Sequence, residues 1–142
     1  MMGEQLQRTT KVLTQGPVRT GRILLVSEDQ EEMEYFMKTL AELDGDLVPC
    51  RSYVEALDRL GREKFNLIIV GQGTPAFEGC RVLERVRELH LSTPVVVTSR
   101  AADMGCYIRA MELGATDYLE SSTMPRQLVG LLDVYLSMRR AA

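Results

Sequence analysis

Three short runs of consecutive apolar residues constrain the fold of this chain more than any other feature. They cover Ile23–Val26, Leu67–Val70 and Pro94–Val97, and all three contain β-branched residues. Unbroken apolar runs of this length are typical of strands covered on both faces, whereas a strand with one wet face alternates apolar and polar residues. We therefore expect a central parallel sheet built from these runs.

Segments with helical periodicity lie between the runs. Asp29 and Glu32 have the spacing of a capping box, as do Ser52 and Glu55, and each pair opens a helix. Gly61 ends the second of these helices, and a further helix follows each later strand. The expected apolar faces are Met33, Phe36, Met37, Leu40 and Leu43; Ala56, Leu57 and Leu60; Val82, Leu83, Val86 and Leu89; and, after a helix from Ala102 to Leu113, Leu128, Val129, Leu131, Leu132, Tyr135 and Leu136.

Two shorter strands complete the alternation. Leu47–Cys50 contains Pro49, which cannot donate a ladder hydrogen bond, so this strand is expected at a sheet edge. Thr116–Leu119 precedes a polar loop and Pro125, which suits the first turn of the last helix. Five strands alternating with five helices predict an α/β fold, a doubly wound five-stranded parallel sheet with helices on both faces.

The composition is that of one ordinary globular domain. The chain has 142 residues, of which 45% are hydrophobic and 26% charged, and its net charge is -3. There is no basic stripe to bind nucleic acid directly and no apolar stretch long enough for a membrane span, so we expect a cytoplasmic protein. Residues 1–21 are polar and are expected to form a tail or linker before a domain over residues 22–139. Residues 140–142 are expected to be the C-terminal end or the start of a linker.

Cysteine and histidine usage gives no support for a metal centre or a catalytic triad. Cys50, Cys80 and Cys106 are far apart and form no C-x-x-C pair, so we expect reduced thiols in or near the core. His90 is the only histidine and ends a helix far from any strand end. No base, nucleophile and orienting group are assembled at the strand ends, so we expect neither an enzyme nor a cofactor.

The loops after the strands should decide the function, because ligands of open parallel sheets bind outside the carboxyl ends of the strands. The run Leu67–Val70 stops at Gly71, which has no side chain to offer. Hydroxyl groups stand after other strands, at Ser27, Ser99 and Ser121. The sequence therefore predicts a polar edge with a gap in its middle.

The order of these motifs resembles the receiver domain of two-component response regulators, over roughly Arg22 to Arg139. The resemblance is carried by Ile23–Val26 with the acidic residues after it, Ser52-x-x-Glu55-Ala56-Leu57, Phe65–Val70, Thr74–Gly79, Pro94–Ser99 and Gly114–Leu119. Each motif alone is weak, but six in this order are specific. The resemblance implies a flavodoxin-like (CheY-like) architecture and a role in phosphorelay-type, bacterial-type signalling.

The resemblance also implies five positions for phosphotransfer, and this chain departs from the family at several of them. The two acidic residues that hold Mg²⁺ in the family fall on Ser27 and Glu28, and the phosphoacceptor aspartate falls on Gly71. Ser99 matches the hydroxyl residue that contacts the phosphoryl group, and Ser121 stands where the family has lysine. Together the five residues read as a degenerate phosphoacceptor site.

This departure predicts a pseudo-receiver, which acts through protein contacts and is not phosphorylated at the usual strand position. An acyl phosphate needs a carboxylate nucleophile in line with the incoming phosphorus, and Gly71 has none. We expect no bound metal, with Glu28 and Asp29 as weak candidates for Mg²⁺ ligands.

The resemblance further implies a switch and an output face. Ser99 and Tyr118 match the family's switch pair, in which the aromatic ring rotates inward as the hydroxyl is drawn to the phosphoryl group, although packing alone explains Tyr118 equally well. The output face comprises the helix Ala102–Leu113, the strand after it and the last helix. Its expected charges are Asp103, Arg109, Asp117, Arg126 and Arg139. The implied partners are proteins: a kinase, an effector domain or another receiver, with a homodimer through the same face.

Two other functions stay open at this point. One is a receiver with unorthodox phosphotransfer at Asp29 or Glu78, acidic residues near the positions at which this chain departs from the family pattern. The other is a small-ligand sensor that uses the vacated space near Gly71, with the serines at the strand ends lining a polar pocket. The simpler alternative for those serines is that they are solvated loop residues.

Overall fold

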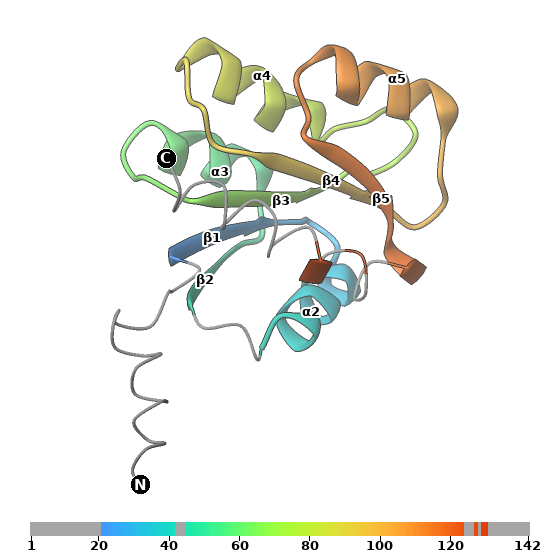
Figure 1. Cartoon of the computed structure of the whole chain (residues 1–142), viewed down its shortest axis with the longest axis horizontal. Helices are drawn as coiled ribbons and strands as arrows, with labels where there is room; N and C mark the ends of the chain where they lie inside the picture. The colour runs from blue at the N-terminus through green and yellow to red at the C-terminus, as the bar shows by residue number, and fades with distance from the viewer. Residues whose placement is uncertain (1–20, 42–44, 124–126, 128, 131–142) are drawn as a thin grey trace, which may run out of the picture.

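The computed structural model describes residues 21–41, 45–123, 127 and 129–130, and its centre is a five-stranded sheet (Figure 1). The strand order is β2-β1-β3-β4-β5, and every adjacent pair is parallel. The strands are β1 (Gly21–Val26), β2 (Gly45–Cys50), β3 (Leu67–Gly71), β4 (Val95–Ser99) and β5 (Asp117–Glu120). The predicted doubly wound parallel sheet is therefore confirmed, with β3 at its centre.

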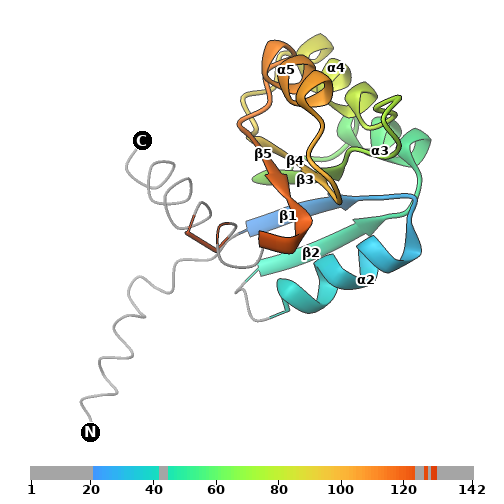
Figure 2. The ribbon, with the colours of Figure 1, turned by 90° about the vertical axis from the view of Figure 1, so that its right-hand side faces the viewer.

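Helices cover both faces of this sheet (Figures 1 and 2). The described helices are α2 (Gln30–Thr39), α3 (Tyr53–Leu60), α4 (Cys80–Glu88), α5 (Met104–Glu112) and the 3-10 turn η1 (Ser121–Thr123). Helices α3, α4 and α5 lie on one face, and α2 lies on the other. No helix in the described part of the chain is long and apolar enough to cross a membrane.

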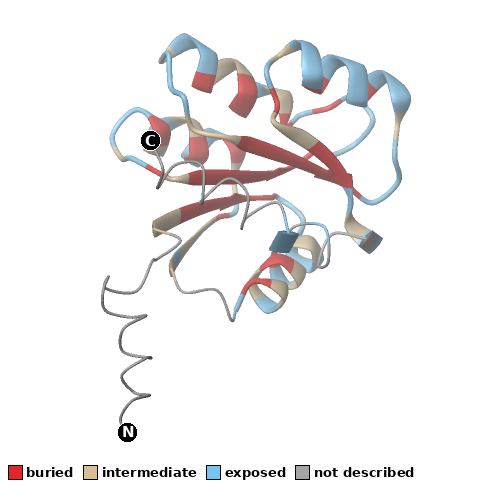
Figure 3. Ribbon diagram, viewed as in Figure 1, coloured by how far each residue is buried: buried red, intermediate tan, exposed pale blue. Residues whose placement is uncertain are grey.

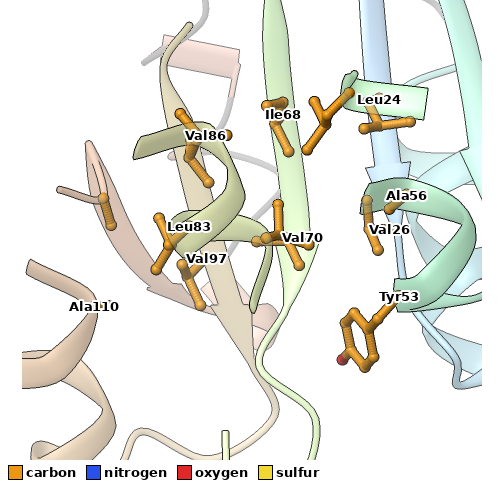
Figure 4. Packing of buried hydrophobic residues seen from close by; sticks show 14 of the residues in the cluster. Leu24, Val26, Tyr53, Ala56, Ile68, Val70, Leu83, Val86, Val97 and Ala110 are labelled. Carbon is orange, nitrogen blue, oxygen red and sulfur yellow. The ribbon is translucent and has the colours of Figure 1, made fainter. Parts of the chain in front are cut away.

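Strand alternation divides the apolar side chains into two cores. Leu24 and Ile68 lie in the core between the sheet and α3, α4 and α5, to which Leu83 and Ala110 also belong (Figure 4). The residues one position along point the other way, toward Met33 and its neighbours on α2. Strands β3 and β4 are buried along their whole length and β1 from Ile23 onward (Figure 3), which explains why their sequences contain continuous apolar runs.

Several element boundaries differ from the sequence-based expectation. Strand β1 begins at Gly21, inside the stretch expected to be a tail. Strand β2 begins at Gly45, two residues before the expected Leu47, and Gly45 pairs with Gly21. Helix α2 ends at Thr39, short of the expected Leu43, which lies outside the described residues. Strand β2 is at an edge, so the prediction made from Pro49 is confirmed. Residues 1–20 and most of the last predicted helix lie outside the described residues, which include Gln127, Val129 and Gly130 as helical positions.

The cysteines lie where the sequence placed them, in or beside the core. Cys50 and Cys106 are buried, Cys80 is half-buried, and all three are free thiols. Burial raises the pKa of the Cys50 thiol to about 11, with the neighbouring Glu55 carboxylate adding to the effect. Cys50 is therefore a protonated packing residue at neutral pH, since only the thiolate is a good nucleophile.

Gly79 allows the loop after β3 to approach the strand closely, and this contact yields a first prediction. A Cβ at position 79 would lie 2.3 Å from the carbonyl oxygen of Gly71, which is backbone and cannot move aside. We expect Gly79→Ala to lower the free energy of unfolding by about 1–3 kcal/mol, as measured by urea denaturation. The matched control is Gly105→Ala on α5, where the closest atom is the Asp103 carboxylate at 3.3 Å. An equal loss in both variants would contradict the steric explanation.

Candidate functional site

The candidate site lies at the carboxyl end of β3, where the strand ends at Gly71. Gly71 is buried, and it pairs with Thr98 on the neighbouring strand β4. Its carbonyl oxygen accepts a hydrogen bond of 2.9 Å from the Tyr53 hydroxyl. Ser27 follows β1 directly and is also buried. The tips of β1, β3 and β4 therefore present serine, glycine and threonine side by side.

The carboxylate of Glu32 fills the space in front of Gly71. A Cβ at position 71 would lie only 2.1 Å from Glu32 Oε1 and 3.0 Å from Glu32 Cδ. The Ser27 hydroxyl donates to Glu32 Oε1 at 2.6 Å, and the Thr98 hydroxyl donates to Glu32 Oε2 at 3.3 Å. Glu32 thus carries a carboxylate from helix α2 to the place that a side chain of residue 71 would occupy.

This geometry corrects the capping box expected at the start of α2. Asp29 does act as the N-cap, since its Oδ1 accepts the backbone N–H groups of Glu31 and Glu32 at 2.9 and 3.2 Å. The Glu32 side chain, however, turns inward to Ser27 rather than closing the box at Asp29. The carboxylate accepts two hydrogen bonds from hydroxyl groups at the strand ends, whereas the capping box would give it one hydrogen bond from an exposed backbone N–H.

Burial makes the Glu32 carboxylate reluctant to ionise. Desolvation raises its pKa above the ordinary value of 4.5 and outweighs the hydrogen bonds from Ser27 and Thr98, which lower it. In the described part of the chain no basic side chain forms an ion pair with Glu32, because Arg100 is paired with Asp29 at 2.6 Å and with Glu31 at 3.4 Å.

The other acidic groups near the site are engaged elsewhere. Glu28 accepts the backbone N–H of Tyr53 at 3.0 Å. Asp29 caps α2 and binds Arg100. Glu78 accepts both the N–H and the hydroxyl of Thr74 at 2.8 Å, and the hydroxyl bond is the main reason that its pKa is lowered. Within the described residues, no group of three His, Cys, Asp or Glu side chains is arranged to hold a metal ion.

A cleft of about 520 Å³ lies over these groups. Its lining consists of residues from the loops at the strand ends: Ser27, Glu28, Asp29, Glu32, Tyr53, Gln72, Gly73, Thr74, Pro75, Glu78, Thr98, Ser99, Arg100 and Ala101. Ser121 and Ser122 line a separate hollow beside Tyr35. The serines of the strand ends are therefore divided between two cavities.

The hydroxyl groups of Ser99 and Ser121 face the backbone. Ser99 is buried, and its hydroxyl donates to the carbonyl of Ala101 at 2.6 Å. Ser121 donates to the carbonyl of Ser99 at 3.1 Å. Thr98, one position earlier than Ser99, is the β4 residue that binds the carboxylate at Gly71.

Tyr118 points inward and is fixed by two hydrogen bonds. Its hydroxyl donates to the side-chain oxygen of Gln72, the residue after Gly71. The same hydroxyl accepts the backbone N–H of Asp103 at 3.2 Å, where Asp103 is the N-cap of α5. Its ring also meets the edge of Tyr107, with ring centroids 5.8 Å apart. Only 9% of Tyr118 is exposed, so packing and hydrogen bonding act together.

Comparison with known proteins decides the family. A sequence model described as the response regulator receiver domain matches residues 23–133. The chain belongs to this receiver family. Receivers are domains of two-component response regulators, and the fold described above is theirs.

Its relatives are longer proteins. The chain is 35% identical over 98 residues to the transcriptional activator protein IrlR of Burkholderia pseudomallei (strain K96243). The aligned region covers 69% of this chain and 42% of IrlR. It is 28% identical over 116 residues to the transcriptional regulatory protein CpxR of Escherichia coli (strain K12), covering 81% of the chain and 49% of CpxR. The chain thus spans less than half the length of these two relatives.

Solved structures agree on the fold. The signal receiver domain of an HD domain-containing protein from Pseudomonas fluorescens Pf-5 superposes with a TM-score of 0.76 at 22% identity, over 87% of this chain and 100% of that one. A response regulator from Thermotoga maritima superposes with a TM-score of 0.68 at 25% identity, over 82% and 98%. The receiver architecture expected from the sequence is confirmed.

The residues expected on the output face of this receiver are distributed around α5 and β5. Arg109 lies on α5 and pairs with Glu84 of α4 at 3.4 Å. Asp117 begins β5, and its Oδ1 accepts the N–H of Tyr118 at 2.8 Å. Arg126 and Arg139 lie outside the described residues.

Four residues of the site were not singled out from the sequence: Glu32, Thr98, Tyr53 and Gln72. The capping-box spacing assigns Glu32 to the helix cap, and the sequence gives no signal for Tyr53. A signal for Glu32 exists, because a glutamate directly before the buried Met33 on the first turn of α2 is adjacent to the apolar face. The match between that glutamate and a missing side chain on β3 is visible only in three dimensions.

The contact between Glu32 and Gly71 gives a second prediction. A methyl group in Gly71→Ala must displace the carboxylate from Ser27 and Thr98, so we expect the free energy of unfolding to fall by about 1–3 kcal/mol. In a Glu32→Ala background the space is open and the same substitution should cost less, with a coupling energy of about 1 kcal/mol or more in the double-mutant cycle. Equal costs in the two backgrounds would show that Glu32 does not occupy this space.

The raised pKa of Glu32 gives a third prediction. The pKa of the Glu32 carboxyl group is higher in the folded state than in the unfolded chain. The free energy of unfolding therefore falls as the pH rises from about 4.5 through the folded-state pKa, because ionisation is easier in the unfolded chain. Glu32→Gln should remove this loss, so the variant should gain stability relative to wild type as the pH rises from 4.5 to neutral. Urea unfolding at several pH values measures the difference. Glu34→Gln, on the exposed side of the same helix, controls for net charge, and an identical profile for both variants would contradict the assignment.

Proposed function

We propose that this receiver is a pseudo-receiver that signals through protein contacts and is not phosphorylated at the end of β3. One observation carries the proposal: residue 71 is glycine, and the carboxylate of Glu32 occupies the space of its missing side chain. Phosphoryl transfer to a receiver in the usual way requires a carboxylate on this residue. The position offers neither the nucleophile nor the room for one.

The chemistry of acyl-phosphate formation supports this proposal. The attacking oxygen must be aligned with the phosphorus, and a misplacement of about 1 Å is heavily penalised. Glu32 has an oxygen near the position of a residue-71 side chain, but its two hydroxyl donors hold the carboxylate in place, and burial raises its pKa. The position at which the family has a lysine to neutralise the phosphoryl group is Ser121 in this chain.

The residues at the strand ends also fit Mg²⁺ poorly. Mg²⁺ needs near-octahedral oxygen ligands, usually one or two carboxylates together with phosphate oxygens. Glu28 is bound to the backbone of Tyr53, and Asp29 is bound to α2 and Arg100. Ser27 and Gly71 supply no carboxylate. We therefore propose that signalling by this chain does not use Mg²⁺.

Phosphotransfer to Asp29 or Glu78 is the weaker alternative. Both carboxylates accept two hydrogen bonds from neighbouring groups, and both serve local structure: Asp29 as the cap of α2, Glu78 as the brace of the loop after β3. Neither carboxylate lies in front of Gly71. A nucleophile at either place would have to break these contacts first.

Contacts with a protein partner are favoured by an apolar stripe on α5. Met104, Tyr107, Ile108 and Met111 lie on its solvent side, and their exposed fractions are 71%, 42%, 48% and 39%. Their spacing puts them on one face of the helix. We propose that this stripe and the adjoining β5 contact a kinase, an effector domain or another receiver, including a second copy of this chain. The relatives named above are transcriptional regulators, which is consistent with an effector domain as partner.

A small-ligand sensor is the second candidate, favoured by the 520 Å³ cleft beside the site. Clefts of this size accommodate small molecules. Glu32 fills the space at Gly71 itself, so a ligand would have to bind between Tyr53 and Arg100 instead. Such binding would raise the melting temperature in proportion to the logarithm of ligand concentration.

Treatment with acetyl phosphate and Mg²⁺ tests the proposed function. We expect the intact mass of the wild-type chain to stay unchanged, because no carboxylate is placed for attack at residue 71. Beryllofluoride with Mg²⁺ should likewise leave the NMR signals of Gly71 and Thr98 in place. A receiver domain that retains aspartate at this position serves as the positive control in the same buffer.

A phosphorylated wild-type chain would overturn the proposal, and three variants would then locate the acceptor. Loss of the added mass in Asp29→Asn or in Glu78→Gln would support unorthodox phosphotransfer at that residue. Loss in Glu32→Gln would identify the buried carboxylate.

A further inference from the structure

We propose that Glu32 is a built-in replacement for the missing side chain of residue 71, and that a chain of hydrogen bonds from Glu32 to Tyr118 holds this receiver in one conformation without phosphorylation. The inference rests on the proposed function and deepens it, because it names the residues that fix the state of the same site. Four side chains carry it: Glu32, Thr98, Gln72 and Tyr118.

The first part of the network joins helix α2 to the strand ends. Glu32 reaches across the tip of β3 and binds Ser27 after β1 and Thr98 on β4, at 2.6 and 3.3 Å. Both hydroxyl residues are almost completely buried, with exposed fractions of 1% and 0%. One carboxylate therefore ties β1 and β4 together over Gly71.

The second part runs from β4 to β5 through Gln72. The backbone N–H of Gln72 donates to the carbonyl of Thr98 at 2.8 Å, so Gln72 is fixed to the residue that binds Glu32. Its side-chain oxygen then accepts the hydroxyl of Tyr118, and its amide nitrogen donates to the carbonyl of Thr74 at 3.3 Å. Gln72 is 3% exposed, so it has little freedom to turn away. We assign Gln72 as the positioning residue for Tyr118.

The network ends at the N-terminus of α5. The Tyr118 hydroxyl accepts the N–H of Asp103, and Asp103 caps α5 by accepting the N–H of Cys106 at 2.9 Å. The orientation of α5, and with it the exposed stripe that begins at Met104, thus depends on the same hydrogen bonds as the carboxylate at Gly71. A buried polar network of this kind is stable only when all of its members are satisfied.

Amide hydrogen exchange at Asp103 tests the proposal, because the N–H of Asp103 is the last donor in the network. Thr98→Val keeps the shape of the β4 residue and removes the hydroxyl that binds Glu32. We expect exchange at Asp103 to become about five- to tenfold faster in this variant, the factor that corresponds to one lost hydrogen bond. Tyr118→Phe should accelerate the same amide by at least as much.

The double variant Thr98→Val/Tyr118→Phe distinguishes a network from separate contacts. In a connected network the second substitution adds little, so exchange at Asp103 should match that of Tyr118→Phe alone. Glu34→Gln on the exposed side of α2 is the control and should leave exchange at Asp103 unchanged. Unchanged exchange at Asp103 in Thr98→Val, or fully additive effects in the double variant, would overturn the proposal.

The result is separable from that of the phosphorylation test. A mass increase with acetyl phosphate would refute the proposed function, whatever the exchange data show. Unchanged exchange at Asp103 together with no added mass would refute only the network. If Thr98→Val unfolds too readily for measurement, Glu32→Ala removes the acceptor of the Thr98 hydroxyl and breaks the same link, with the same expected acceleration at Asp103.

Discussion

The site depends on one steric constraint: the Glu32 carboxylate occupies the space in which a side chain of residue 71 would lie. Glu32 lies within 2.1 Å of where a Cβ of residue 71 would be, so the two positions cannot both carry a large side chain. Glycine on β3 and glutamate on α2 therefore form one structural unit. The hydroxyl groups of Ser27 and Thr98 complete it by satisfying the carboxylate at the tips of β1 and β4.

The charges around this unit follow from the same constraint. A largely buried carboxylate that forms no ion pair within the described residues is costly when ionised, and its raised pKa reflects that cost. The hydroxyl of Ser121 hydrogen-bonds to the backbone carbonyl of Ser99. This edge of the sheet is held by the Glu32 carboxylate together with hydroxyl and backbone groups.

Helix α5 and strand β5 are connected to the site by backbone as well as side chains. Gln72 follows Gly71 in sequence and binds Thr98 and Tyr118, so the loop after β3 is in contact with β4 and β5 at once. The N-cap of α5 is attached to Tyr118. The parallel sheet fixes the positions of all these loops, and a few hydrogen bonds join its edge to the N-terminus of α5.

The sequence by itself determined the architecture and the family. Unbroken apolar runs, helical periodicity and Pro49 were enough to predict a parallel sheet with β2 at an edge, because burial on both faces leaves a local signature in the chain. The sequence also showed that residue 71 has no carboxylate. It could not show that Glu32 fills the gap, or that Thr98 rather than Ser99 binds there. Which residue faces α2 depends on strand register and on the side-chain direction of a helix distant in sequence, and both are set only when α2 packs on the sheet.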